Sequence, residues 1–195
     1  DYDSDNWLGD SDVEDLLNER GDYAGNFNAS VLEFDFVPIA NDMSFDFIFA
    51  SNEYGPSYQC GYSDIFAFLL TDLTTNERKN IAVVPHTDIP ISVTTIHDAK
   101  YQGMQDCGDA NKEYFDKYYG EIGLPKLDNA INYAGRTVPM QAHAKVVPGR
   151  KYHIKLAIAD YSDTGVNSAV FLKAGSFKIG EVDLGADLTV SEGTA

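Results

Sequence analysis

Residues 31–37 read VLEFDFV, and this stretch decides the fold class because apolar and charged side chains alternate along it. Leu32, Phe34 and Phe36 fall on one face of an extended chain, and the two acidic residues between them fall on the other. Period-two alternation is typical of a β-strand with one buried and one solvated face. The stretch therefore predicts a strand at the surface of a core.

The same alternation returns in MSFDFIFA (43–50), where three phenylalanines share one face. The intervening PIAND contains Pro, Asn and Asp, which favour turns, so we expect the two strands to form a hairpin. In the simplest register Asp35 and Asp46 would lie nearly opposite each other. Like charges in that position repel, and we expect exposure to solvent to relieve the repulsion.

Six further segments have strand-like character and are joined by turns rich in Gly, Pro and Asn. Two segments look helical: 11–17, whose Ser11 and Glu14 have capping-box spacing, and 110–119, within a long insertion at 98–135. We predict an all-β fold, a two-sheet antiparallel β-sandwich of jelly-roll-like type, with a short N-terminal helix and a partly helical insertion. The six strand-like segments are 64–72, 80–85, 91–96, 137–146, 151–159 and 168–179.

The composition of the chain narrows the range of functions that it can have. The 195 residues suffice for one domain with a core, and 31 acidic residues against 14 basic ones give a net charge of −17. Such a surface repels phosphate groups, which argues against nucleic-acid binding and against docking on anionic membranes. No apolar run approaches the roughly 20 residues of a membrane helix, so we expect no direct membrane insertion. Excess carboxylates suit divalent cations and a secreted protein.

The two cysteines, Cys60 and Cys107, have two interpretations. They could be free buried thiols of a cytosolic protein, or they could form a disulfide between two polar, glycine-flanked loop positions, CGYSD and DCGD. We favour the disulfide, which implies an oxidising, extracellular compartment. No CxxC pair or His/Cys cluster accompanies them, so a zinc site is not indicated.

Several motifs in order along the chain, from about Ser4 to Phe177, resemble the choice-of-anchor L domain. That resemblance implies that the chain is part of a large, secreted, surface-anchored protein. Many proteins of this family are exported by type IX secretion and linked to gliding motility. The resemblance also implies that residues 1–180 form this domain without its first upstream strands. Residues 181–195 would be a linker into a following domain, because VDLGADLTVSEG resembles the opening of another module. The family's usual SEEY is SNEY here, with Asn52 in place of a carboxylate. The motifs are VLEFDFVP, FDFIFASNEY, SDIFAFLLTD, NIAVVP, YHIKLAIADYSD and NSAVFLKAGSF.

The loop ADYSDTGVNS (159–168) supplies Asp160, Asp163 and Asn167 between two strands, and hard oxygen ligands of this kind suit calcium. Glu53 and Asp64 lie at the ends of two other strands. If these strand ends converge, four carboxylates meet, and they cannot all stay ionised without a cation. The sequence predicts a calcium site here; the alternative is a polar turn whose side chains bond nearby backbone groups.

The opening DYDSDNWLGDSD places Asp1, Asp3 and Asp5 at the first alternate positions of an EF-hand-like loop. Asn6 stands where such loops carry glycine, and a β-sandwich offers no flanking pair of helices. We interpret the stretch as an acidic lead-in to the first helix. A second calcium site on the three aspartates is the alternative.

Four aromatic residues in the insertion have two interpretations. On a helix, Tyr114 and Tyr118 would share one face, and Phe115 and Tyr119 the neighbouring face. We favour packing of these rings against the sandwich, and the alternative is a platform on which sugar rings stack.

The sequence contains little that indicates a catalytic site. The four histidines are scattered, and the sequence contains no nucleophile elbow, phosphate loop or dinucleotide fingerprint. We therefore predict a non-catalytic, extracellular binding or adhesion module of a larger cell-surface protein, with a glycan or another surface ligand and its neighbouring domains as partners. A structural spacer that projects other modules is the alternative, and a glycan-active enzyme comes third.

Overall fold

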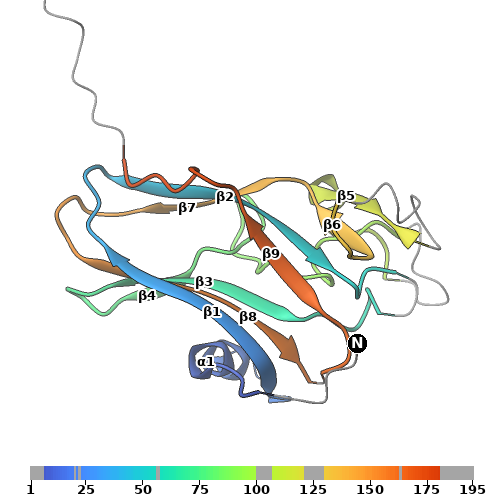
Figure 1. Cartoon of the computed structure of the whole chain (residues 1–195). Coiled ribbons are helices and arrows are strands. Elements are labelled where there is room, and N and C mark those ends of the chain that lie inside the picture. The colour runs from blue at the N-terminus through green and yellow to red at the C-terminus, as the bar shows by residue number, and fades with distance from the viewer. Residues whose placement is uncertain are drawn as a thin grey trace, which may run out of the picture.

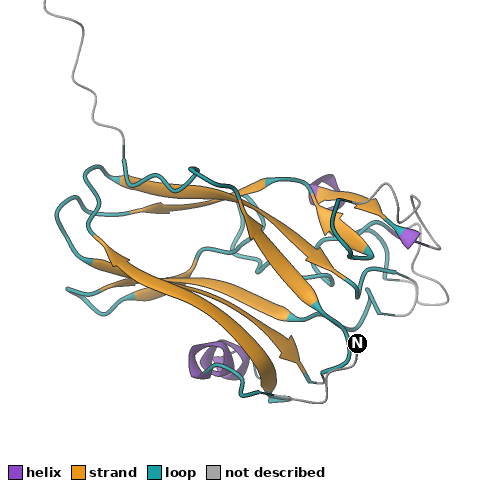
Figure 2. Cartoon of the chain, in the orientation of Figure 1, coloured by secondary structure: helices purple, strands orange, loops and turns teal. Residues whose placement is uncertain are grey.

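A computed structural model shows two antiparallel sheets packed face to face, with one short helix against the outer face of one sheet (Figures 1 and 2). The predicted two-sheet β-sandwich is confirmed. The described residues are 7–19, 21, 23–55, 58–99, 107–120, 130–162 and 164–180. The elements are α1 (Ser11–Glu19), β1 (Asn26–Phe36), β2 (Asp42–Ser51), β3 (Ile65–Asp72), β4 (Arg78–Asn80), η2 (Lys112–Tyr114), β5 (Phe115–Tyr118), β6 (Gly135–Thr137), β7 (Met140–Lys145), β8 (Tyr152–Tyr161) and β9 (Ser168–Leu172).

The first sheet has the strand order β1-β8-β3-β4, and the second has the order β5-β6-β2-β7, with β9 pairing β2 as well. The core lies between β2 of the second sheet and β3 of the first. Phe47 and Phe68 have ring centroids 5.0 Å apart, and so have Phe49 and Phe66. Each ring is at most 2% exposed, and burying one such side chain stabilises the fold by about 1.5–3 kcal/mol.

The hairpin expected between residues 31–37 and 43–50 is wrong, because β1 and β2 lie in different sheets. Their apolar faces oppose each other across the core, and the link between them carries the chain from one sheet to the other (Figure 1). Asp35 lies opposite His153, and Asp46 lies opposite Gln141, so the two aspartates do not face each other. A hydrogen bond from the Lys151 ammonium, aided by His153, lowers the pKa of the Asp35 carboxyl.

Helix α1 is capped by Asp10 rather than by Ser11. The Asp10 Oδ1 atom accepts the backbone N–H groups of Asp12 at 3.0 Å and Val13 at 3.2 Å, which is the bonding of an N-cap residue. The Lys155 ammonium lies 2.6 Å from a carboxylate oxygen of both Asp10 and Asp12. This ion pair fixes the start of the helix on the sheet, and buried Val13 then packs against the outer face of that sheet.

The insertion contains less helix than its aromatic spacing predicts. The helix expected over 110–119 is a single 3-10 turn, η2, followed by strand β5, which pairs with β6. Aromatic residues also favour strands, and pairing with β6 satisfies the backbone of the segment. Residues 100–106 and 121–129 of the insertion lie outside the described residues.

Cys60 and Cys107 form a disulfide, with their Cα atoms 5.6 Å apart. The bond joins the turn after β2 to the start of the insertion. His97 lies beside it, 2% exposed, with its Nε2 atom 3.3 Å from the Cys107 sulfur. The linkage therefore attaches the insertion to the body of the sandwich beside a buried histidine.

The only α-helix among the described residues has nine residues, and none of the described helices is long and apolar enough to cross a membrane.

Candidate functional site

Several strand ends meet at one end of the sandwich. Strands β2 and β8 finish there, and β1, β3 and β9 begin there (right side of Figure 1). Three of the predicted carboxylates follow from these positions: Glu53 lies two residues after β2, Asp64 directly precedes β3, and Asp160 is the penultimate residue of β8. They are 6%, 4% and 9% exposed, respectively. The predicted convergence of these strand ends is therefore seen in the structure.

Hydrogen bonds hold the members of this carboxylate cluster, Glu53, Asp64 and Asp160, in place. Glu53 Oε2 accepts the Asp64 backbone N–H at 2.7 Å and the Ser51 hydroxyl at 3.3 Å. The Asn28 side-chain amide donates to Asp160 Oδ2 at 2.8 Å. The Asp64 Oδ2 atom is buried and has no hydrogen-bond partner. An unsatisfied buried oxygen is costly, and a hydrogen-bond donor or a cation would satisfy it.

The charge state of Asp64 follows from its surroundings. Burial, followed by the negative charge of Glu53, raises the pKa of its carboxyl to about 8, even though a hydrogen bond from Ser168 acts in the opposite direction. At neutral pH the carboxyl therefore holds a proton for most of the time in the absence of a cation. A divalent cation placed beside it would favour the ionised form.

The cluster is rich in oxygen, but its side chains are not arranged around one point. Among the described residues, no three acidic, His or Cys side chains already form a metal-binding group. Binding a cation would therefore require the carboxylates to turn toward one another, which would replace their mutual repulsion by attraction to the ion. In the observed geometry the Asp64 carboxyl holds a proton. The cluster would hold a cation only after its carboxylates have turned toward one another.

Other predicted ligands lie apart from the cluster or outside the described residues. The side chain of Asn167 is exposed, and its backbone carbonyl accepts the Asn52 N–H at 3.0 Å. Asp163 lies outside the described residues, and so do the three aspartates of the alternative second site, Asp1, Asp3 and Asp5.

The aromatic residues of the insertion pack against the core. Tyr118 and Tyr119 are each 5% exposed, and the Tyr118 hydroxyl donates to Gln59 Oε1 at 2.8 Å. Tyr114 and Phe115 are half-buried and contact the same core. The burial of Tyr118 and Tyr119 and the partial burial of the other two favour the packing interpretation, and sugar stacking stays a prediction.

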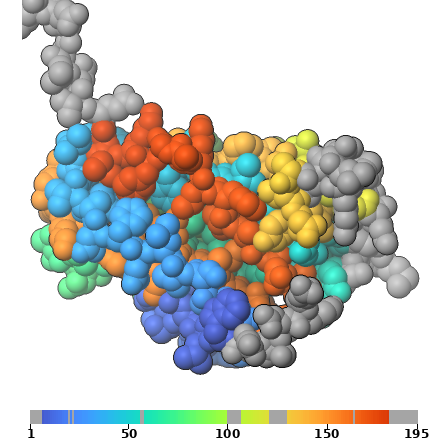
Figure 3. Space-filling view, viewed as in Figure 1, coloured from blue at the N-terminus to red at the C-terminus, as the bar shows by residue number. Residues whose placement is uncertain are grey.

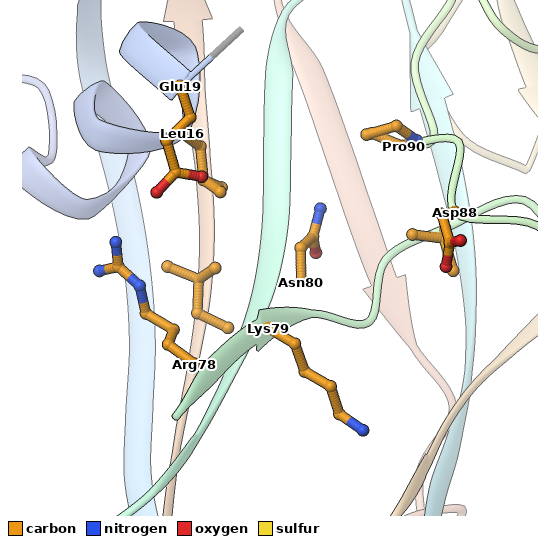
Figure 4. Close-up of a pocket in the computed structure, with 9 residues that line it drawn as sticks. Leu16, Glu19, Arg78, Lys79, Asn80, Asp88 and Pro90 are labelled. Carbon is orange, nitrogen blue, oxygen red and sulfur yellow. The ribbon is translucent and has the colours of Figure 1, made fainter. Parts of the chain in front are cut away.

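A second polar site lies between α1 and β4. It is a pocket of about 350 Å³ with mixed charge (Figure 4). Glu19 projects from α1 on one side and Asp88 lies on the other, with Asn80 between them. Arg78 of its wall pairs with Asp12. The pocket has no local sequence motif, because its walls come from segments that are distant along the chain.

Sequence reasoning missed Asn28 and Ser51 as neighbours of the cluster. Asn28 reaches Asp160 because the register of β1 on β8 shifts between Phe27 and Ser30, and because its backbone takes a positive φ of 52°. The only signal available was that asparagine tolerates this conformation better than most residues. A bulge of this kind depends on the partner strand and is not visible in a single segment.

Comparison with known proteins gives one match. A sequence model of the choice-of-anchor L domain matches residues 1–178, which includes every strand described above. No curated protein and no solved structure matches the chain.

Proposed function

Because the chain belongs to the choice-of-anchor L domain family, we propose that it is a binding or adhesion module of an extracellular protein, stabilised by calcium at the carboxylate cluster. The family is not an enzyme family, and its domains occur in surface proteins, which supports a non-catalytic, surface-associated module. We extend the proposal to export by type IX secretion and a role linked to gliding motility, on the resemblance of the motifs.

The observation that supports calcium is the unpartnered Asp64 Oδ2 atom beside two other buried carboxylates. Calcium accepts six to eight oxygen ligands in adaptable geometry, so side chains and backbone carbonyls of adjoining loops can contribute together. Extracellular modules bind calcium with dissociation constants of roughly 10⁻⁴ to 10⁻³ M, and a site of that strength is filled outside cells. Glu53, Asp64 and Asp160 are the principal ligands of this proposal, and the sequence also offers Asp163 and Asn167 in the loop after Asp160.

The proposed ligand is a glycan or another component of a surface, and the strongly acidic chain disfavours anionic partners. A binding role predicts that the domain adheres by itself, whereas a spacer only separates its neighbours.

The test is binding of the full 195-residue chain, in millimolar calcium, to a glycan array and to polysaccharide-coated surfaces. We expect saturable binding that weakens when calcium is chelated. Asp160→Asn should reproduce that weakening, and Asp88→Asn, which removes the same charge from an exposed site, should not. A folded chain that binds neither probe would contradict the adhesion role and favour the spacer, and turnover of a glycan would indicate an enzyme.

A further inference from the structure

One side of the sandwich is open between β1 and β9. Leu32 lies opposite Leu156 on the face of β1 that also carries buried Phe36, and Leu172 lies opposite Phe47 of the core. Both leucines therefore belong to inward-facing positions. They are nevertheless 51% and 44% exposed. No described segment covers them.

The exposed leucines line a continuous apolar groove. Two adjoining hollows of about 240 and 170 Å³ share Leu156 and Leu172 in their walls. One hollow extends to Ser30 and Leu32, and the other extends to Phe177. In the space-filling view, β1 (blue) and β9 (orange-red) border this face (Figure 3). We name it the β1/β9 groove.

The backbone beside the groove also has strand edges that are free to form hydrogen bonds with an added strand. Strand β1 pairs with β8 along one edge, and at its other edge Trp7 and Leu8 bond only Asn28 and Ala29. Within the described part of the chain, no strand pairs with the remaining edge, 30–36, or with the outer edge of β9. An apolar groove with a free strand edge is suited to an added strand, which takes main-chain hydrogen bonds and inserts alternate side chains.

A segment outside the described residues has the pattern that this groove requires. Residues 182–190 read VDLGADLTV, with apolar side chains at 182, 184, 186, 188 and 190 and Asp, Gly or Thr between them. Strict alternation of this kind over nine residues is the signature of a strand with one buried face. We propose that residues 182–190 dock in the β1/β9 groove of the same chain as an additional strand, antiparallel to β1.

The position of the preceding residues supports this placement. The Phe177 ring lies 5.5 Å from the ring of Phe36, at the end of β1, and the Ile39 N–H donates to the Ile179 carbonyl at 3.0 Å. The chain therefore leaves the described structure where β1 ends, and a segment that turns back from there runs antiparallel to β1. Nine extended residues span about 30 Å, enough to turn and cover the seven residues of the free edge, about 23 Å.

The test is amide hydrogen exchange of the full chain, compared with a double variant, Leu184→Asp with Leu188→Asp. We expect the amides of 30–36 that do not bond to β8 to be protected in the unmodified chain. In the double variant they should exchange roughly tenfold or more faster, because the added strand is lost. A control, Thr189→Asp, adds a charge on the opposite face of the same segment and should leave the protection in place.

Three results would overturn the proposal. Rapid exchange of these amides in the unmodified chain would show that residues 182–190 act only as a linker. Equal protection in the double variant would show that another segment covers β1. Protection that disappears on dilution, together with a dimeric mass at high concentration, would assign the groove to a second copy of the chain.

Discussion

Replacing Cys60 and Cys107 together with serine should lower the free energy of unfolding by about 4 kcal/mol. The disulfide closes a loop with a sequence separation of 47 residues, and a loop of that length restricts the unfolded chain by about this amount in the chain-entropy model. The native state also loses a fixed attachment, because the bond connects the turn after β2 to the insertion that carries β5. Domains of this size have only about 5–15 kcal/mol of total stability, so the effect is a large fraction of it.

Urea unfolding at equilibrium measures this loss. The serine double variant and the unmodified chain in excess reductant should unfold at the same urea concentration, well below that of the oxidised chain. A loss smaller than about 1 kcal/mol would show that the bond contributes little. Two free thiols in the secreted protein would contradict the pairing and the extracellular assignment that depends on it.

Asp64→Asn should remove most of the pH dependence of stability in the calcium-free domain. The folded-state pKa of Asp64, about 8, is raised above its ordinary value of 3.8, chiefly by burial and next by Glu53. The folded state therefore binds more protons than the unfolded state between these two values. Its contribution to stability is complete below about pH 4 and is lost as the pH rises through about 8, with an upper limit of roughly 6 kcal/mol.

The measurement is urea unfolding in chelator at several pH values between about 5 and 9. The unmodified domain should lose stability from about pH 5 to about pH 8 and then level off, whereas Asp64→Asn should change little and be the more stable protein at the alkaline end. The exposed Asp88 supplies the control, because Asp88→Asn should retain the steep dependence. Parallel curves for the unmodified domain and Asp64→Asn would show that Asp64 is ionised in both states.

Alternation in the sequence predicted most of the strands but not their partners, and the strand expected over 91–96 was wrong, because that segment forms a turn. VLEFDFV would show the same pattern whether its apolar face packed beside MSFDFIFA or opposite it, and the structure has the second arrangement. The helix cap was misplaced by one residue, because aspartate and serine are both good caps. The position of Lys155, which holds Asp10 and Asp12 on the sheet, is a tertiary feature that no local motif reveals.

The carboxylates of the site were easier to predict than their neighbours. These three carboxylates, Glu53, Asp64 and Asp160, lie at strand ends. Because antiparallel strands begin and finish at the two ends of a sandwich, the strand pattern predicts that the three lie close together. Asn28 was missed because it reaches the site through a shift in strand register. The aromatic residues of 110–119 were assigned to a helix because their spacing fits one, and β6 provided a strand partner that the sequence does not show.

Thermal unfolding at about pH 8, in millimolar calcium and in excess chelator, tests the calcium-stabilised carboxylate cluster most directly. A site with a dissociation constant of about 10⁻⁴ to 10⁻³ M stabilises the folded state by about 0.4–1.4 kcal/mol in about 1 mM calcium. For a domain of this size, that stabilisation raises the melting temperature by about 1–5 °C. We predict this increase for the unmodified domain and for Asp88→Asn, and its loss in Asp160→Asn. Coincident melting curves for the unmodified domain in the two conditions would contradict calcium binding at the cluster.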